Sequence, residues 1–252
     1  NSDAVLLLLE KIARREGFGD VLADGVVKAA DRIGRGSSKY AMHVKGLEIF
    51  QADPRGLKAY ALGVAVATRG GDHLRSEPSF EFTENPSEGL RRFGSAESAF
   101  RLEYKGKGKV VKFYEERCAL ADCLNVCKNT VVNMEILSFD EAARLLVAAT
   151  GLPFTAESLQ QSAERVMNLE RAYIVREGIR RKDDTLPERF LTEPLPPDCG
   201  ASAGHVVELE PMLEEYYRSH DWDSRTGIPT REKLSELGLD SIAADLAERG
   251  IL

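Results

Sequence analysis

The sequence has no apolar run long enough to cross a lipid bilayer. A membrane-spanning helix needs about 20 apolar residues, whereas the run Val5–Leu9 is followed at once by Glu10 and Lys11. No basic segment precedes this run and no small-residue cleavage site follows it, so it does not have the pattern of a secretory signal. The sequence therefore predicts a protein that does not bind membranes.

The sequence also lacks a basic block, and it has few cysteines. Its 34 basic and 41 acidic residues give a formal net charge of −7. This argues against nucleic acid as the main partner, because phosphate binding needs clustered Lys and Arg. Four cysteines in 252 residues are too few for a disulfide scaffold. We therefore expect reduced thiols and a cytoplasmic location.

A strand followed by a glycine-rich loop and a helix is missing as well, which argues against a nucleotide-binding α/β domain. Helical periodicity is found along most of the chain instead. Ser138 and Glu141 form a capping box, and Gly151 ends the helix that follows. Helices are expected over about Asp3–Glu16, Asp20–Gly34, Ala59–Thr68, Val110–Leu124 and Ser138–Gly151, then after Thr155, Thr230 and Asp240.

These patterns predict an all-α fold with one or two multihelical units. The segment Tyr40–Ile49 is short and partly alternating, which is compatible with a strand or an extended connector. In the long helix after Thr155, an apolar stripe is expected to face the core. The stripe consists of Leu159, Ala163, Val166, Leu169, Ala172 and Tyr173.

The segment Ser76–Gly108 is the least regular part of the chain, with two prolines and four glycines. Its last residues, Lys105–Lys109, alternate lysine with glycine. A solvated turn is favoured there over a phosphate-binding loop. Trp222 lies between two aspartates and is predicted to be an anchor near the surface.

Three of the four cysteines, Cys118, Cys123 and Cys127, fall within ten residues. Thiolates at this density suit soft metals, above all iron–sulfur clusters and zinc. The spacing C-x4-C-x3-C matches neither a zinc knuckle nor the C-x2-C-x2-C run of small ferredoxins. Buried thiols without a metal are therefore an equally good interpretation of the spacing alone.

His73 follows Gly70 and Gly71 and is followed by Arg75. Glycines allow a ligand to approach the backbone closely. A histidine here is suited to carry a proton beside a guanidinium that binds an anion. A loop histidine with ordinary hydrogen bonds is the competing interpretation.

An ordered set of segments resembles the C-terminal portion of the tungsten-containing aldehyde:ferredoxin oxidoreductase family. The similarity runs nearly from end to end of the chain. The matching segments are Leu8–Asp20, Tyr40–Glu48, Asp53–Gly56, His73–Arg75, Asp122–Cys127, Tyr216–Asp223 and Gly227–Arg231.

The resemblance implies a tungsten or molybdenum bis-pterin cofactor and one [4Fe–4S] cluster, with aldehydes oxidised to carboxylic acids and electrons passed to ferredoxin. It implies that the cofactor lies between a helical C-terminal part and an N-terminal β domain. It also divides this chain into residues 1–43, the end of the family's middle helical domain, and residues 44–252, its C-terminal helical domain.

The family motif Asp-x-x-Gly-Leu-Cys aligns with Asp122–Cys127. By this resemblance Asp122 holds a pterin amine, Val126 stands at the cofactor-binding Leu position, and Cys127 is the fourth cluster ligand. Asn125 replaces the family's Gly, and Asn is one of the few residues that tolerate left-handed φ. His73 matches a histidine proposed to move protons, and Arg75 matches a basic residue that touches the pterin.

The resemblance places the other cluster cysteines, the first pterin Asp motif and an active-site glutamate before Asn1. One thiolate cannot hold a [4Fe–4S] cluster, which needs four ligands. We therefore expect this chain to be a piece of a longer polypeptide that is inactive alone and binds neither cofactor nor cluster. Its expected partners are the N-terminal domain of the same polypeptide, ferredoxin and a small aldehyde, and homodimerisation is left open.

Three other interpretations are left open by the sequence. A relative with the same cofactor can act on another substrate, such as an aromatic thioester. A cofactor-free helical scaffold would use its cysteines only as core residues. A zinc site built from Cys118, Cys123, Cys127 and a histidine ranks last. The sequence does not distinguish tungsten from molybdenum and assigns no role to Cys199.

Overall fold

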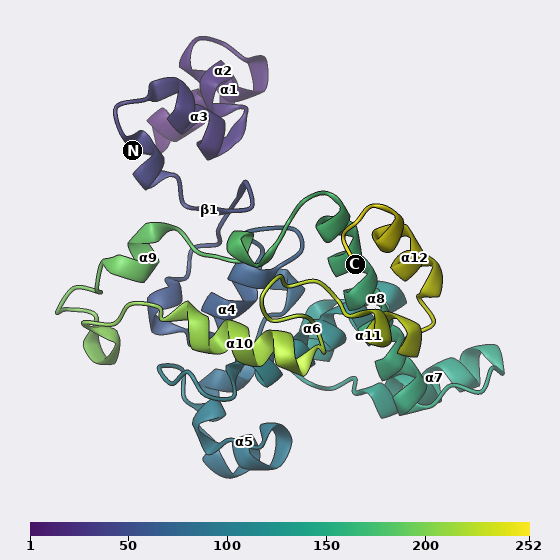
Figure 1. Ribbon diagram of the computed structural model, residues 1–252. Coiled ribbons are helices and arrows are strands. Elements are labelled where there is room, and N and C mark those ends of the chain that lie inside the picture. The colour runs from purple at the N-terminus through teal and green to yellow at the C-terminus, as the bar shows by residue number, and fades with distance from the viewer.

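The computed structural model describes all residues from 1 to 252, and most of them are helical (Figure 1). The predicted all-α fold is confirmed, and no helix is both long and apolar enough to span a membrane. The α-helices are α1 Ser2–Arg14, α2 Phe18–Leu22, α3 Gly25–Ile33, α4 Lys58–Val66, α5 Pro86–Phe93, α6 Lys107–Leu124, α7 Phe139–Thr150, α8 Ala156–Arg176, α9 Glu188–Thr192, α10 Leu209–Ser219, α11 Arg231–Glu236 and α12 Asp240–Glu248.

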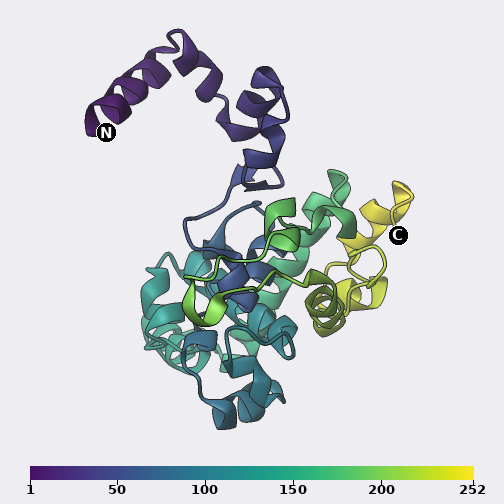
Figure 2. The same cartoon turned by 90° about the vertical axis from the view of Figure 1, so that its left-hand side faces the viewer.

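The segment Tyr40–Ile49 contains the one sheet of the protein, a two-stranded antiparallel hairpin. Strand β1 is His43–Val44 and strand β2 is Leu47–Glu48. The hairpin joins α1–α3 to the rest of the molecule, and in two views at right angles these helices stand apart from the remaining ones (Figures 1 and 2). The predicted boundary between residues 43 and 44 falls within β1 and stays a prediction.

The prediction of one helix over Asp20–Gly34 is wrong, because the chain breaks between α2 and α3. Asp20 does not cap a helix. It lies inside α2 and pairs with Arg15 at 3.1 Å and with Arg32 at 3.2 Å. Gly25 starts α3 with φ of 86°, a conformation that favours glycine. Helix α1 buries no residue, so its apolar side chains Val5–Leu9 remain exposed.

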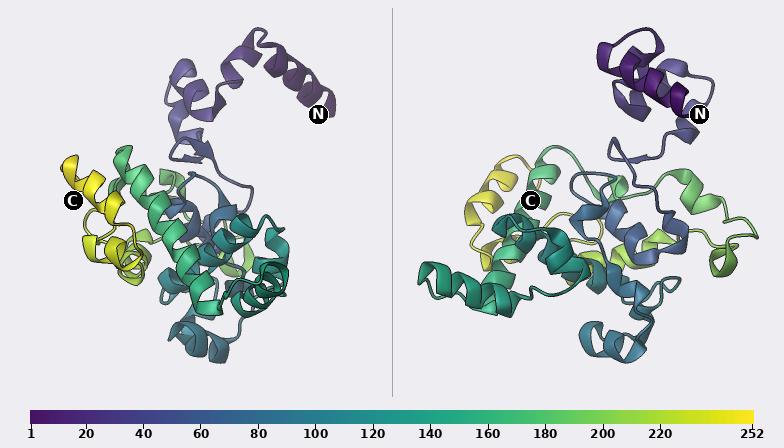
Figure 3. Two further views of the ribbon diagram at one scale, coloured as in Figure 1. Left: turned by 90° about the vertical axis from the view of Figure 1, so that its right-hand side faces the viewer. Right: turned by 180° about the vertical axis from the view of Figure 1, so that it is seen from behind.

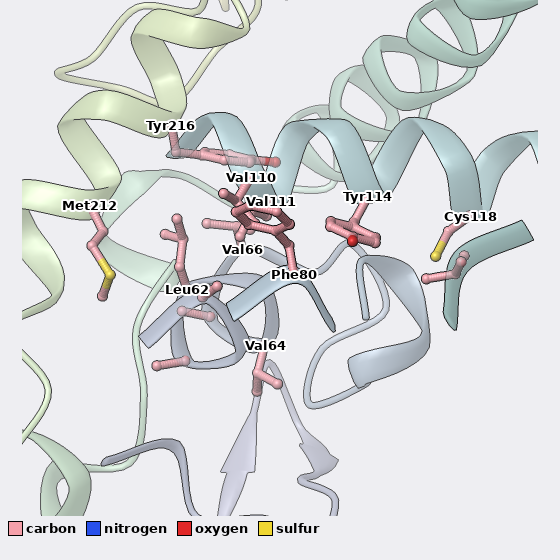
Figure 4. Packing of buried hydrophobic residues seen from close by; sticks show 14 of the residues in the cluster. Leu62, Val64, Val66, Phe80, Val110, Val111, Tyr114, Cys118, Met212 and Tyr216 are labelled. Atoms are coloured by element: carbon pink, nitrogen blue, oxygen red, sulfur yellow. The ribbon is translucent and has the colours of Figure 1, made fainter. Parts of the chain in front are cut away.

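Helix α6 is the centre of the main body and packs against α4, α8 and α10. Figure 4 shows Val110, Val111, Tyr114 and Cys118 pointing from one side of α6 toward α4 and the segment that carries Phe80. These residues belong to a core of 30 buried side chains, which also takes in Met212 and Tyr216 from α10. Helix α4 is buried along its whole length, as its small apolar residues predict.

The prediction of a solvated turn over Lys105–Lys109 is wrong for the middle residue of this segment, Lys107. Lys107 is fully buried at the first position of α6, and its Nζ lies 3.2 Å from Oε2 of the equally buried Glu81. The Glu81 carboxylate also accepts the backbone N–H groups of Ala59 at 2.9 Å and Tyr60 at 3.2 Å. One buried ion pair thus joins the first turns of α4 and α6.

The four helices predicted in the second half, α7, α8, α11 and α12, begin within one residue of their predicted starts. Ser138 and Glu141 form the capping box of α7, and Gly151 ends that helix with φ of 73°. Thr155 caps α8, but the predicted core-facing stripe of α8 is partly wrong. Leu169 is 43% exposed and Tyr173 is 57% exposed, because α6 contacts a neighbouring face of α8. That face buries Met167, Asn168, Arg171 and Val175.

Helices α5, α9 and α10 have no counterpart in the sequence-based prediction. The α10 region lacks a side-chain cap, and its core position is decided by contact with α6.

Trp222, predicted near the surface, is 5% exposed and donates from its indole N–H to Asn168 at 2.8 Å. Figure 3, with views from the side and from behind, shows α5 and α7 projecting from the body at a distance from α1–α3.

We expect Lys107→Met to lower the free energy of unfolding by about 3–5 kcal/mol, because it leaves the Glu81 carboxylate buried without its cation. Lys105→Met is the matched control. Its side chain is 71% exposed and its partner is Glu97, so the loss should be about 1 kcal/mol or less. Denaturant unfolding of both variants measures the difference, and equal losses would contradict the structural role of the Glu81–Lys107 pair.

Candidate functional site

A buried guanidinium joins three segments of the chain at the candidate site. Arg75, the last residue of a short 3-10 helix over His73–Arg75, is 5% exposed. Its Nη1 donates to Oδ2 of Asp122 at 2.8 Å. Its Nη2 donates to both carboxylate oxygens of Glu170, at 2.5 and 2.6 Å. Two predicted site residues, Arg75 and Asp122, are therefore in direct contact.

A second cation balances the charges around Arg75. Lys128 Nζ lies 3.1 Å from Oδ2 of Asp122 and donates to the carbonyl of Leu74 at 2.6 Å. Burial lowers the pKa of Arg75, but the attraction of Glu170 and Asp122 outweighs it and the net shift is upward. Two cations and two carboxylates thus form a neutral network beside His73.

The Asp122 carboxylate keeps one oxygen free. Both Arg75 and Lys128 bind its Oδ2, while no protein group donates a hydrogen bond to Oδ1. The side chain is 44% exposed. A carboxylate oxygen held in this way is suited to accept N–H donors of a bound ring.

The chain turns sharply after Asp122, and the turn exposes Cys127. Asn125 has φ of 54° and ψ of 40°, and the backbone N–H groups of Asn125 and Val126 close the end of α6 on the carbonyls of Asp122 and Ala121. Asn125 therefore takes the left-handed conformation expected of the family's glycine at this position. Val126 is 38% exposed, and the Cys127 thiol is free.

His73 lies at the edge of the same network. Its ring stacks on Phe50, with ring centroids 4.4 Å apart and planes 21° apart, and the side chain is half-buried. Gly70 and Gly71, expected to leave room for a ligand, instead approach the β1–β2 hairpin. A Cβ on Gly71 would lie 2.5 Å from the carbonyl oxygen of Leu47. These glycines fix the loop before His73 against the hairpin.

Unpartnered polar atoms cluster next to His73. Arg75 Nε, Ser76 Oγ and Glu77 Oε2 are buried without a hydrogen-bond partner. Glu77 has φ of 41°, an uncommon conformation for a residue with a Cβ. Buried unpaired groups and positive φ are costly and tend to gather at functional sites. The segment 73–77 is therefore the part of the chain with the strongest local signs of function.

The structure does not bring the clustered cysteines together. Cys118 is part of the hydrophobic core, and burial raises the pKa of its thiol to about 12. Cys123, Cys127 and Cys199 are exposed. No group of three or more His, Cys, Asp or Glu side chains is arranged to hold a metal ion. Cys127 thus remains the one predicted metal ligand, and it would need further ligands from outside this chain.

Glu170 and Lys128 are members of the network that sequence reasoning missed. Glu170 lies 95 residues from Arg75 in the chain, and its neighbour Leu169 was expected to face the core. Thr68 donates its hydroxyl to Glu170 at 2.8 Å. Thr68 and Glu170 line a cavity of about 530 Å³ together with Arg75, Leu169 and Tyr173. No local sequence signal connects Glu170 with Arg75.

Comparison with known proteins identifies the family of this chain. The family described as aldehyde ferredoxin oxidoreductase, domains 2 and 3, matches residues 1–239. This chain belongs to the aldehyde ferredoxin oxidoreductase family. The sequence is 36% identical over 248 residues to the tungsten-containing aldehyde ferredoxin oxidoreductase of Pyrococcus furiosus, covering 95% of this chain and 37% of that protein. The chain therefore spans little more than a third of such relatives.

The chain is also similar to proteins with other names. The WOR-like subunit of an aliphatic sulfonate oxidoreductase of Pyrococcus furiosus is 28% identical over 246 residues, which is 92% of this chain and 34% of that protein. Among solved structures, the BamBC active-site complex of benzoyl coenzyme A reductase superposes with a TM-score of 0.72 and 23% identity. The superposition covers 97% of this chain and 40% of the chain in that structure. This likeness establishes the fold.

This family member contains a second group of ionisable side chains, away from the Arg75 network. Glu115 is 1% exposed and accepts the Tyr216 hydroxyl at 3.0 Å, and His220 Nε2 lies 3.1 Å from its other oxygen. Burial raises the pKa of Glu115 to about 8 and lowers the pKa of His220 well below its usual value. His220 is a core residue bonded to Glu115.

The Glu115–His220 pair makes stability depend on pH. Between the ordinary pKa values of 4.5 for Glu115 and 6.5 for His220, the folded chain protonates Glu115 and the unfolded chain protonates His220, so the two effects cancel. From pH 6.5 to about 8, only the folded Glu115 still holds a proton. The free energy of unfolding should therefore fall as pH rises, by up to about 1.4 kcal/mol per pH unit.

Glu115→Gln is expected to remove this fall, because an amide does not titrate and still accepts the Tyr216 hydroxyl. Denaturant unfolding of both proteins at several pH values between 6.5 and 8 provides the measurement. A slope that persists in the variant would assign the pH dependence to another group.

Proposed function

We propose that this chain is the helical part of a tungsten or molybdenum bis-pterin oxidoreductase, and that the whole protein oxidises aldehydes to carboxylic acids with ferredoxin as electron acceptor. The observation that carries the proposal is the turn at the end of α6. It presents the free Oδ1 of Asp122 and the exposed thiol of Cys127, and it contacts the His73–Arg75 segment through the Arg75–Asp122 ion pair and the bond from Lys128 to the Leu74 carbonyl. This donor set fits a cofactor that needs a carboxylate for its ring N–H groups and a cluster that needs a thiolate.

In this proposal Asp122 accepts N–H donors of one pterin, and the backbone around Val126 follows the cofactor's edge. Cys127 is one ligand of a [4Fe–4S] cluster, since iron–sulfur clusters are bound by cysteine thiolates. Arg75, predicted to touch the pterin, is bonded to Asp122 and would act on the cofactor through that carboxylate. The bound metal would supply the two-electron oxidation, and the cluster would carry electrons onward.

The role of His73 in this proposal is to accept or donate a proton at its imidazole. The stacked Phe50 ring fixes the plane of the imidazole, and Gly70 and Gly71 fix the loop in front of it. A half-buried, oriented ring is therefore suited to proton transfer with a small substrate.

The rest of the proposed enzyme lies outside this chain. Relatives are about two and a half times as long, and the missing cluster cysteines and the β domain are assigned to the remaining part of the same polypeptide. We accordingly propose that the 252 residues alone are inactive and retain neither cofactor nor cluster. A cytoplasmic location is part of the same proposal, and homodimerisation is left open.

Another substrate is the second candidate. The relatives include a protein named for aliphatic sulfonates, and an aromatic thioester is a further substrate class that the fold can accept. Turnover of aldehydes, sulfonates and thioesters by the whole protein, with a low-potential electron carrier, distinguishes these candidates.

Metal analysis of the whole protein, purified without oxygen, tests the cofactor proposal. About four irons per tungsten or molybdenum are expected. Cys127→Ser should lower the iron content, because a cluster ligand is lost, while Cys199→Ser on a distant exposed loop should leave it unchanged. Full iron in the Cys127→Ser protein would exclude Cys127 as a cluster ligand. A wild-type protein with no metal would favour the cofactor-free scaffold, and zinc alone would favour the zinc-site interpretation.

His73→Gln is expected to reduce kcat for aldehyde oxidation by about 100-fold or more, since it removes the proposed proton carrier. Tungsten and iron contents should stay normal. His205→Gln, in the loop before α10, is the control and should retain activity. Normal turnover of the His73→Gln protein would exclude His73 as the proton carrier.

A further inference from the structure

We infer that Glu170 is a positioning residue for the cofactor, and that it acts through Arg75 on Asp122. The inference rests on the proposed function and adds a residue to it. Arg75 has little freedom to touch a cofactor itself, because its side chain is 7% exposed and both terminal nitrogens already donate to carboxylates. Its effect on a cofactor must pass through the groups that it holds.

Glu170 determines the orientation of the Arg75 guanidinium. Both of its oxygens bind the same nitrogen, Nη2, at 2.5 and 2.6 Å, and the Thr68 hydroxyl holds one of these oxygens at 2.8 Å. Glu170 projects from α8, a helix of 21 residues that is packed against α6. Because a guanidinium is planar and rigid, fixing Nη2 also fixes the direction of Nη1.

Nη1 then determines how Asp122 presents its carboxylate. Arg75 Nη1 lies 2.8 Å from Oδ2, and Lys128 Nζ reaches the same oxygen at 3.1 Å. Two cations on one oxygen hold the carboxylate in one rotamer and leave Oδ1 pointing away from both. Oδ1 is the atom that remains available for a pterin N–H donor.

Glu170 also sets the local charge. With Glu170 ionised, Arg75 and Lys128 are balanced by Glu170 and Asp122. Without it, Asp122 would be the one carboxylate left to face both cations, and Arg75 would be drawn more fully onto it. The carboxylate would then be a weaker and less well-oriented acceptor for the cofactor.

A double-mutant cycle in the whole protein tests this inference. The variants are Glu170→Gln, Asp122→Asn and the two together, with tungsten and molybdenum per protein as the readout and the EPR signal of the pentavalent metal as the second. The control is Glu164→Gln on the same helix, which removes a carboxylate paired with Lys112 and Lys233. Melting temperatures show that each variant is folded.

Glu170→Gln should reduce the retained metal about tenfold, the effect typical of residues that orient a ligand. The double variant should retain no less metal than Asp122→Asn alone, because Glu170 has no other route to the cofactor. Glu170→Gln should also shift the EPR signal of the metal it retains, whereas Glu164→Gln should change neither readout.

Additive losses in the double variant, or normal metal content and EPR signal in Glu170→Gln, would overturn the inference and leave the proposed function intact. A wild-type protein that contains neither tungsten nor molybdenum would overturn both. Thr68→Val provides a second variant if Glu170→Gln does not fold. It removes the hydroxyl that holds Glu170, and a smaller metal loss that vanishes in the Asp122→Asn background is expected.

Discussion

The candidate site depends on the neutralisation of one buried guanidinium. An unpaired charge at the depth of Arg75 would be strongly destabilising, so the chain must bring carboxylates to it. Asp122 comes from the last turn of α6 and Glu170 from α8. The ion pairs therefore hold the His73–Arg75 helix, α6 and α8 in one arrangement. Because the turn that exposes Cys127 follows α6 directly, the same ion pairs also fix its position.

The same principle holds the rest of the molecule together. Asp184 is 1% exposed and lies 2.9 Å from Lys45, 2.8 Å from Arg171 and 2.5 Å from the Tyr217 hydroxyl. This cluster joins the β1–β2 hairpin to α8 and α10, and so links the helices that stand apart to the main body. Buried charges thus decide which elements meet, in addition to the apolar core around α6.

Features that depend on neighbouring residues were predicted well. The capping box of α7, the end of that helix at Gly151, and the start of α8 after Thr155 all follow from hydrogen bonds within four residues. The left-handed turn at Asn125 belongs to the same class. Such features involve no contact with distant parts of the chain, so the amino-acid order alone is sufficient for them.

Features that depend on packing were not predicted. Tyr173 has the periodicity of a core residue, yet the neighbouring face of α8 is buried because α6 lies against it. The family and the Asp122–Cys127 motif can be identified from the order of residues. The contacts of Arg75 with residues 47 and 95 positions away exist only in the folded chain, because a charge selects its partner by distance in space and by burial.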